Sequence, residues 1–238
     1  MVLFLGLLPG CAGDIEPVGD GLETESIFED EEYTVEDDPV IEEFNRIMFE
    51  FNLFLDDYFF SPAAKVAKTL LPDAALKAMY NFTYNLYSPF SAVNHLLQWR
   101  LHEMCEDVAA FMINTTLGVG GVLPVASDLG VYPKYTDFGV TLARWGVPNG
   151  PMIMFPFLGP MYPNDIVGSL FKQVLDPVTY ALNRFDLSEW QMPLLSLELL
   201  TLRIAQGDQI DFARENAFDF YTTFKVMYDQ RREALINN

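Results

Sequence analysis

The sequence predicts an all-α protein made of short, kinked amphipathic helices gathered around a polar interior. Half of its 238 residues are hydrophobic, and residues 78–99, 108–127 and 145–164 contain no Asp, Glu, Lys or Arg. Each of these stretches is long enough to cross a bilayer as a helix, but Pro, Gly or small polar residues interrupt every one. Broken backbone at membrane depth survives only where protein or a water-filled cavity satisfies its polar groups. No alternating strand pattern of any length competes with this prediction.

The N-terminus has the character of a secretory signal. Seven of the first eight residues are apolar, and Leu8-Pro9-Gly10-Cys11 resembles a bacterial lipobox, in which the signal is removed before a cysteine that carries the lipid anchor. We therefore expect residues 1–10 to be the remnant of a signal peptide and Cys11 to be the lipid attachment site. Ala12, the next residue, permits sorting to the outer membrane. The alternative is an ordinary buried N-terminal segment with a chance cysteine.

Negative charge is concentrated in the segment that follows. Fourteen of the 34 acidic residues lie between Asp14 and Glu43, whereas every Lys and Arg lies at Arg46 or later. Residues 11–37 hold few large apolar groups, so we expect an acidic, disordered tether, with a partner-binding segment as the alternative. The net charge of −20 argues against nucleic-acid binding, because phosphate contacts require clustered cations.

The body of the chain begins with a long helix over residues 39–60. Asp38 followed by Pro39 is typical of a helix start. A helical period places most of its large apolar residues in one broad arc, but Phe49, Leu53 and Phe60 fall on the opposite, polar side. This double pattern suits a helix at a membrane interface or between two partners. A helix buried on both sides in a soluble core is the alternative.

Further helices are expected where apolar periodicity follows a Pro or Asx start. In the last of them, Arg231 and Arg232 are expected to complement the helix dipole at its C-terminal end. The predicted ranges are 63–71, 73–87, 100–117, 137–145, 163–175, 177–185, 189–206 and 211–234.

Sequence motifs of enzymes are missing. The chain has no Gly-x-Ser-x-Gly, no P-loop, no Cys-x-x-Cys and no His-Glu-x-x-His. His102, Cys105 and Glu106 share a helix face and could contribute to a metal site, but a fourth ligand is not evident. We therefore expect no catalytic residues, no metal and no cofactor, and we interpret Cys105 as a buried free thiol.

A set of short motifs extends along residues 38–232. The most specific is the Phe111-to-Asn114 segment that runs into Gly118, Gly120 and Gly121. The others are Phe44-Asn45-Arg46, Phe51-Asn52, Asn81-Phe82, Asp137-Phe138-Gly139, Trp145-Gly146-Val147, Gly159-Pro160 and Gln230-Arg231-Arg232. Together these motifs resemble the MlaA/VacJ family of outer-membrane lipoproteins.

The resemblance implies a fold, a function and partners. The helices of residues 38–238 would form a ring around a polar pore, embedded in the outer membrane of a Gram-negative bacterium and anchored at its periplasmic face. The ring would remove mislocalised glycerophospholipids from the outer leaflet and pass them to a soluble, MlaC-like periplasmic carrier, in association with a trimeric porin. The alternatives are a lipoprotein that scaffolds porins without moving lipid and, third, a membrane lipase. The residues assigned to the channel or lipid path are Phe51, Asn52, Asn114, Gly118, Gly120 and Gly121.

Overall fold

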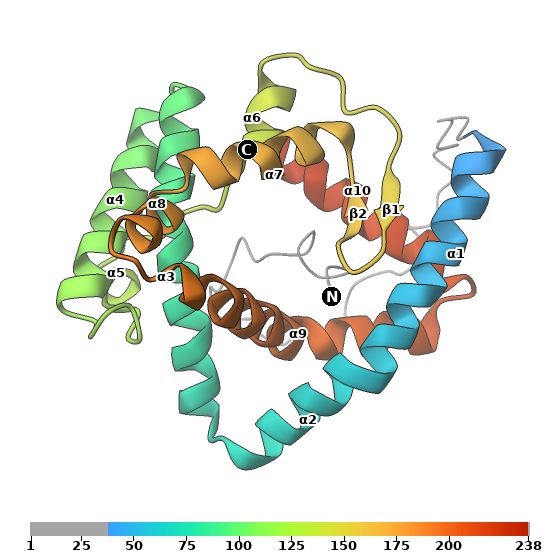
Figure 1. The fold of residues 1–238 in the computed structure, drawn as a ribbon, viewed down its shortest axis with the longest axis horizontal. Helices are drawn as coiled ribbons and strands as arrows, with labels where there is room; N and C mark the ends of the chain where they lie inside the picture. Colours follow the sequence, from blue (N-terminus) through green and yellow to red (C-terminus); the bar gives the residue numbers. More distant parts are fainter. Residues whose placement is uncertain (1–37, 238) are drawn as a thin grey trace, which may run out of the picture.

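A ring of helices dominates the structure, a computed structural model that describes residues 38–237 (Figure 1). The expected signal remnant, Cys11 and the acidic segment 11–37 lie outside the described residues. The ring follows the chain through α1, η2, α2 and α3, and α9 crosses back toward α1 and α2. Their bounds are α1 Pro39–Leu55, η2 Asp56–Phe60, α2 Ser61–Leu70, α3 Asp73–Leu97 and α9 Gln191–Asn216.

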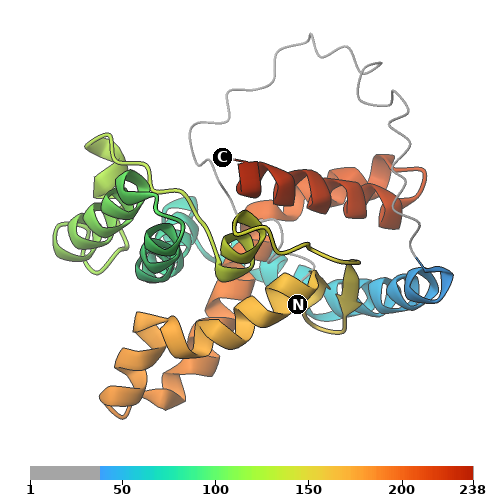
Figure 2. The ribbon, with the colours of Figure 1, turned by 90° about the horizontal axis from the view of Figure 1, so that it is seen from above.

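The remaining elements close the ring and cover its two faces. A two-stranded antiparallel hairpin packs against α1, with Met154 of β1 opposite Pro160 of β2. Helix α10 lies on one face of the ring, and α7 with α8 projects from the other (Figure 2). Their bounds are α4 Leu101–Thr116, α5 Val125–Asp128, α6 Phe138–Arg144, β1 Ile153–Phe155, β2 Gly159–Met161, α7 Pro163–Leu175, α8 Pro177–Arg184, η3 Ser188–Trp190 and α10 Phe220–Asn237.

Helices α3 and α9 are long, with 25 and 26 residues. Over residues 38–237, no helix combines the length and the apolar composition that a bilayer crossing requires. Stretches 108–127 and 145–164 are divided among helices, turns and the hairpin, as their Pro and Gly content predicts, whereas 78–99 lies almost entirely within α3.

A π-helical turn, η2, joins α1 to α2. The Asp38 side chain caps α1 by accepting a hydrogen bond from the Val40 N–H at 2.9 Å. At the far end, Ser61 N–H donates to the Asp56 carbonyl, one residue further back than in an α-helix. Pro62, which has no N–H and whose ring crowds the preceding turn, follows this wide turn directly. The helix therefore continues through residue 60 into α2 instead of ending there.

Helix α1 is inverted relative to a helix of a soluble domain. Its buried positions include the polar side chains of Asn45 and Asn52, together with Phe49. Phe49 and Leu53, which the helical period places on the polar side, belong to the core or pack against it. The broad apolar arc on the other side is exposed, and therefore the alternative of a helix buried on both sides is wrong. The exposed residues of the arc include Val40, Phe44, Ile47, Phe51, Phe54, Tyr58 and Phe59.

Three sequence predictions about helix continuity and exposure are wrong. Helix α3 runs uninterrupted past Pro89, because its packing against α4 and α9 outweighs the lost hydrogen bond. No break separates residues 206 and 211, since α9 includes Gly207. Cys105 is exposed, not buried, because α4 turns other positions, such as Asp107, toward α3. The buried Asp107 carboxylate lies 2.7 Å from the ring nitrogen of buried His95.

The hydrophobic core is small and lies between α1, the hairpin, α9 and α10. Phe49 is its centre, with the rings of Phe220, Tyr221 and Phe224 between 5.4 and 5.5 Å from its own. The other buried members of the cluster are Met152, Met154, Tyr162, Leu202, Ile210 and Tyr228. The core therefore joins the two ends of the described chain.

A buried ion pair joins α9 to the end of α1. The Arg203 guanidinium contacts both carboxylate oxygens of Asp56, at 2.8 and 3.1 Å, and both side chains are almost fully buried. Gly207 leaves room for this pair: a Cβ there would lie 2.3 Å from Nη1 of Arg203, so a larger residue would displace the guanidinium. The predicted gap between residues 206 and 211 is therefore part of α9, where the missing side chain of Gly207 leaves room for Arg203.

Replacing Asp56 with Ala is expected to destabilise the ring strongly, because it leaves the Arg203 charge buried without its main partner. The cost is about 3–5 kcal/mol, or a fall of roughly 10 °C in melting temperature in detergent micelles. Asp57→Ala is the matched control: Asp57 pairs with Arg214 at 2.6 Å, but both side chains are 41 % exposed. Its loss should cost less than about 1 kcal/mol. Equal melting temperatures for the two variants would contradict the assignment.

Candidate functional site: a polar interior held by α1

Two asparagines of α1 hold the hairpin in place. Asn45 donates to the Met152 carbonyl at 2.8 Å and accepts from the Met154 N–H at 2.7 Å. About two helical turns later, Asn52 donates to the Phe155 carbonyl at 2.9 Å and accepts from the Phe157 N–H at 2.9 Å. Each side-chain amide thus pairs with the backbone as a neighbouring strand would. Asn52 is fully buried, so both of its bonds are protected from water.

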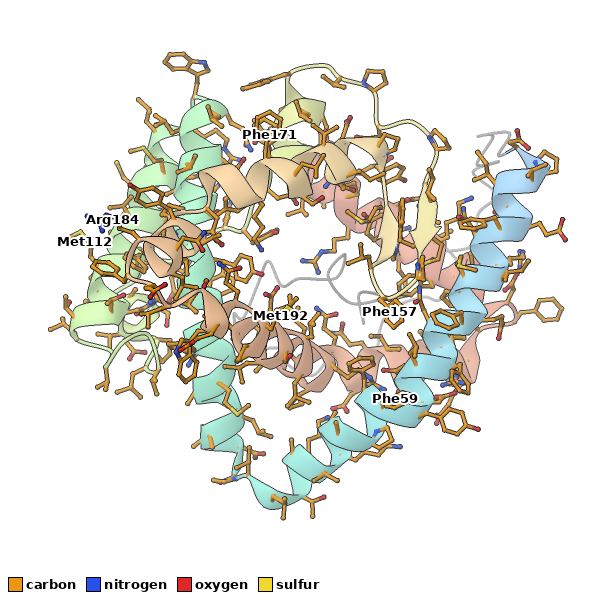
Figure 3. All side chains as sticks on the ribbon, in the orientation of Figure 1. Phe59, Met112, Phe157, Phe171, Arg184 and Met192 are labelled. Atoms are coloured by element: carbon orange, nitrogen blue, oxygen red, sulfur yellow. The ribbon has the colours of Figure 1, made fainter. Side chains whose placement is uncertain are left out.

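Phe51, the other predicted residue of α1, contacts the same hairpin turn. It is 38 % exposed, and its ring makes an edge contact with Phe157 at 5.5 Å between centroids. Phe157 lies at the turn of the hairpin, beside α1 (Figure 3). The structure therefore brings Phe51 and Asn52 together at the hairpin turn.

Asn114 and the three glycines form a separate group at the end of α4. The Asn114 side chain accepts a hydrogen bond from the Ala126 N–H at 2.8 Å. A Cβ on Gly118 would lie 2.3 Å from the Leu123 carbonyl oxygen, and Gly121 has φ +95° with Asn85 against it. Gly120 has φ +74° and open space around it. These residues build a tight turn between α4 and α5, which lie on the far side of α3 from the ring interior (Figure 1). Their role in a lipid path stays a prediction.

A cluster of tyrosines lines the place where α3, α7 and α9 meet. Helix α3 presents Tyr80, Tyr84 and Tyr87 at helical spacing, and Tyr135 from the segment before α6 makes an edge contact with Tyr87. A cavity of about 10 Å³, room for roughly one water molecule, lies among these rings and Glu198. Thr83 and Thr201 link α3 to α9 through their hydroxyls at 3.3 Å. We call Tyr80, Tyr84, Tyr87, Tyr135, Lys172 and Glu198 the tyrosine cluster.

Charged groups in the tyrosine cluster are forced toward their neutral forms. Lys172 donates to the Tyr87 hydroxyl at 2.8 Å and lies over its ring at 4.1 Å. Burial lowers the pKa of Lys172 and raises that of Glu198, while the attraction between the two opposes both shifts. Burial also raises the pKa of Tyr87 well above its ordinary value. The cluster is therefore a polar but poorly hydrated surface.

A second charged group lies where α6, α7 and α10 meet. Arg232 Nη2 lies 2.5 Å from Asp165 Oδ1, and its Nη1 lies 3.6 Å from Asp137. Tyr228 donates to Asp165 at 3.1 Å. Burial raises the pKa of Asp165 to about 6, although Arg232 acts in the opposite direction.

Sequence reasoning missed the tyrosine cluster and misplaced the arginines. Arg231 and Arg232 lie inside α10, which continues to Asn237, so they do not complement its C-terminal end as predicted. The available signal was the spacing of Tyr80, Tyr84 and Tyr87 within a stretch that has no charge. Within the described range, no three His, Cys, Asp or Glu side chains are grouped to hold a metal ion.

The fold and the site define a class of protein: a ring of amphipathic helices with apolar side chains exposed on its rim and polar side chains turned inward. The chain belongs to the MlaA lipoprotein family, whose model matches residues 36–235.

Relatives and a solved structure agree with this assignment. The chain is 31% identical over 204 residues to the "Intermembrane phospholipid transport system lipoprotein MlaA" of Escherichia coli, covering 83% of this chain and 78% of that one. It is 34% identical over 197 residues to an uncharacterised protein of Rickettsia prowazekii, covering 82% and 76%. A solved structure described as "Structural basis for maintenance of bacterial outer membrane lipid asymmetry" matches with a TM-score of 0.72 and 31% identity, covering 84% of this chain and 99% of that chain.

Asn52→Ala is expected to loosen the hairpin, because it removes both hydrogen bonds that fix the turn on α1. The cost is about 1–3 kcal/mol, and limited proteolysis should cut faster within residues 153–161. Glu50→Ala is the control, since Glu50 is an exposed residue of the same helix. An Asn52→Ala protein that resists protease as well as the control would show that the asparagine does not position the hairpin.

Stability should depend on pH through Asp165. Its pKa is raised from 3.8 to about 6 in the folded protein, so its contribution to stability is full below about pH 4 and is lost as pH rises through 6. Wild type should therefore gain up to about 3 kcal/mol relative to Asp165→Asn between pH 7 and pH 4. Melting curves of both proteins across this range test the sign. A constant difference, or a loss on acidification, would contradict it.

Proposed function

We propose that this protein removes mislocalised glycerophospholipids from the outer leaflet of the outer membrane and transfers them to a soluble periplasmic carrier. The observation that supports this proposal most strongly is the distribution of side chains: an apolar arc is exposed on α1, while amide, carboxylate and tyrosine groups lie inside. The family and the "intermembrane phospholipid transport system" name of its relatives support it.

The physical task is to carry a charged headgroup through hydrocarbon. An isolated charge is costly there, whereas a polar interior offers hydrogen bonds in place of water. The apolar rim of the ring leaves the acyl chains in contact with hydrocarbon. No bond is made or broken, so we propose transport without catalysis or a cofactor, in a direction set by the carrier.

Membership of the family supports a proposed setting for this activity. We propose that Cys11 is acylated, that the anchor lies at the periplasmic face of the outer membrane in a Gram-negative bacterium, and that residues 11–37 tether the ring to it. A trimeric porin and an MlaC-like carrier are the proposed protein partners. Phe51 and Asn52, by fixing the hairpin turn, are proposed to shape the lipid path.

A transfer assay with the full-length lipoprotein tests the function. Wild type in vesicles should deliver a labelled phospholipid to an added periplasmic carrier, and protein-free vesicles should not. In cells, Cys11→Ser should leave the outer-membrane fraction, while Ala12→Ser serves as the matched control. A wild-type protein that binds porin but neither retains nor transfers lipid would support a porin scaffold instead. Release of lysolipid would indicate a lipase, and an unchanged location of Cys11→Ser would contradict the anchor.

A further inference from the structure

The turn of the hairpin presents two large apolar side chains that the protein leaves half uncovered. Phe157 is 51 % exposed, and its neighbour Leu158 is 45 % exposed. Both belong to the stretch 145–164, which has no Asp, Glu, Lys or Arg. The turn is therefore an apolar projection without a charged side chain.

Phe157 also has a backbone conformation that is unfavourable for its residue type. Its φ is +64°, in the left-handed region that a residue with a Cβ rarely adopts. Such strain persists only where surrounding contacts impose it, and it is frequent at ligand-binding sites. Gly159, two residues later, has φ +77°, and glycine adopts that conformation without strain. The same turn thus keeps an aromatic side chain at a position where glycine would be less strained.

Two residues of α1 hold Phe157 in this conformation. Its N–H donates to the Asn52 side chain at 2.9 Å, and its ring makes the edge contact with Phe51, with 5.5 Å between centroids. Asn52 also donates to the Phe155 carbonyl at 2.9 Å, which fixes the start of the turn. Helix α1 therefore holds the ring of Phe157 in one place while half of its surface stays uncovered.

The contact with Phe51 joins the turn to the exposed apolar arc of α1. Phe54 lies three residues further along the same helix face, and its ring centroid lies 4.6 Å from that of Tyr58. The hairpin lies on the inner side of α1 (Figure 1), and Phe157 lies at its turn (Figure 3). We call Phe157, Phe51, Phe54 and Tyr58 the aromatic track. It leads from the exposed arc to the inner side of α1.

An acyl chain fits the aromatic track better than a folded partner does. Helix α10 lies on one face of the ring and α7 with α8 projects from the other, so a ligand at the inner side of α1 must be slender (Figure 2). An acyl chain is slender and is held by apolar contacts alone. Asn52, the residue after Phe51, is polar and fully buried, so the track ends where polar side chains begin. A phospholipid has the same boundary between its chains and its headgroup.

We infer that Phe157 positions an acyl chain of the transported glycerophospholipid at the inner edge of α1, together with Leu158 and Phe51. This inference rests on the proposed function and names the residue that holds the apolar part of the ligand. An acyl chain of the surrounding membrane has the same chemistry, so the test must separate transported lipid from bulk lipid.

Substitution of Phe157 should reduce transfer without reducing stability. The test uses the full-length lipoprotein in vesicles, a labelled phospholipid and the periplasmic carrier. In Phe157→Gly the relief of backbone strain offsets the lost ring contact, so the melting temperature should stay within about 3 °C of wild type. Transfer should nevertheless fall about fivefold to tenfold, because the acyl chain loses an aromatic contact. A residue with only a structural role would lose stability and transfer together.

Further variants separate the side chain from the backbone. Phe157→Asn is polar but tolerates a positive φ, so it should fold and should transfer as poorly as Phe157→Gly. Phe157→Leu keeps an apolar side chain and should transfer within about threefold of wild type. Trp99→Gly is the matched control, since Trp99 is an exposed aromatic residue with φ +60° at the turn before α4. It relieves the same kind of strain outside the hairpin and should leave transfer unchanged.

A phospholipid with a photoreactive diazirine in one acyl chain tests the contact directly. On irradiation in the same vesicles, it should label the hairpin turn, residues 155–158, of wild type. Added carrier removes transported lipid and should therefore reduce this label. Label on the exposed arc, for example at Phe44, comes from bulk lipid and should not respond to the carrier.

The other outcomes contradict the inference in distinguishable ways. Transfer within about twofold of wild type in both Phe157→Gly and Phe157→Asn overturns it while the proposed function stands. If neither variant folds, labelling of wild type still decides. An unlabelled turn leaves this surface to another partner, and a label that ignores the carrier assigns it to bulk lipid; both overturn the inference. A wild type that transfers no phospholipid overturns the proposed function first.

Discussion

The inward orientation of polar side chains on α1 is the constraint on which the rest of the structure depends. Asn45 and Asn52 bind the backbone of the hairpin, and Asp56 binds Arg203 of α9. These three contacts join the first helix to elements more than 100 residues away and so close the ring. The apolar arc on the other side of α1 remains exposed. The hydrophobic effect in water does not account for that arrangement.

Hydrogen bonds and ion pairs therefore hold the helices together here, whereas a soluble domain relies on a large hydrophobic core. A hydrogen bond in surroundings of low dielectric is electrostatically stronger than one exposed to water, and leaving it unmade is more costly. The asparagine pairs, the buried Asp56–Arg203 contact and the buried His95–Asp107 contact each join two elements. Such contacts fix the positions of the helices although the hydrophobic core is small. Their cost is that each buried charge needs a partner inside the protein.

Local sequence patterns predicted the helices and the exposed arc, because capping and periodicity are local properties. They did not predict continuity where tertiary packing decides it. The predicted helix 73–87 ends before Pro89, which lies within α3, and the predicted gap between 206 and 211 includes Gly207, which makes room for Arg203 within α9. Of the residues assigned to the lipid path, Phe51 and Asn52 meet at the hairpin turn, while Asn114 and its glycines shape a turn outside α3. The assignment to a lipid path stays a prediction.

The interior charges could not be predicted from sequence, because neighbouring residues on one helix have opposite surroundings. Arg232 forms ion pairs with Asp165 of α7 and with Asp137 before α6, whereas no carboxylate among residues 38–237 pairs with Arg231, one residue earlier. A single rotation step of 100° along α10 therefore separates an ion-paired cation from one that has no carboxylate partner in this part of the chain. Both arginines have the same local sequence pattern, so only the arrangement of α6 and α7 around α10 distinguishes them.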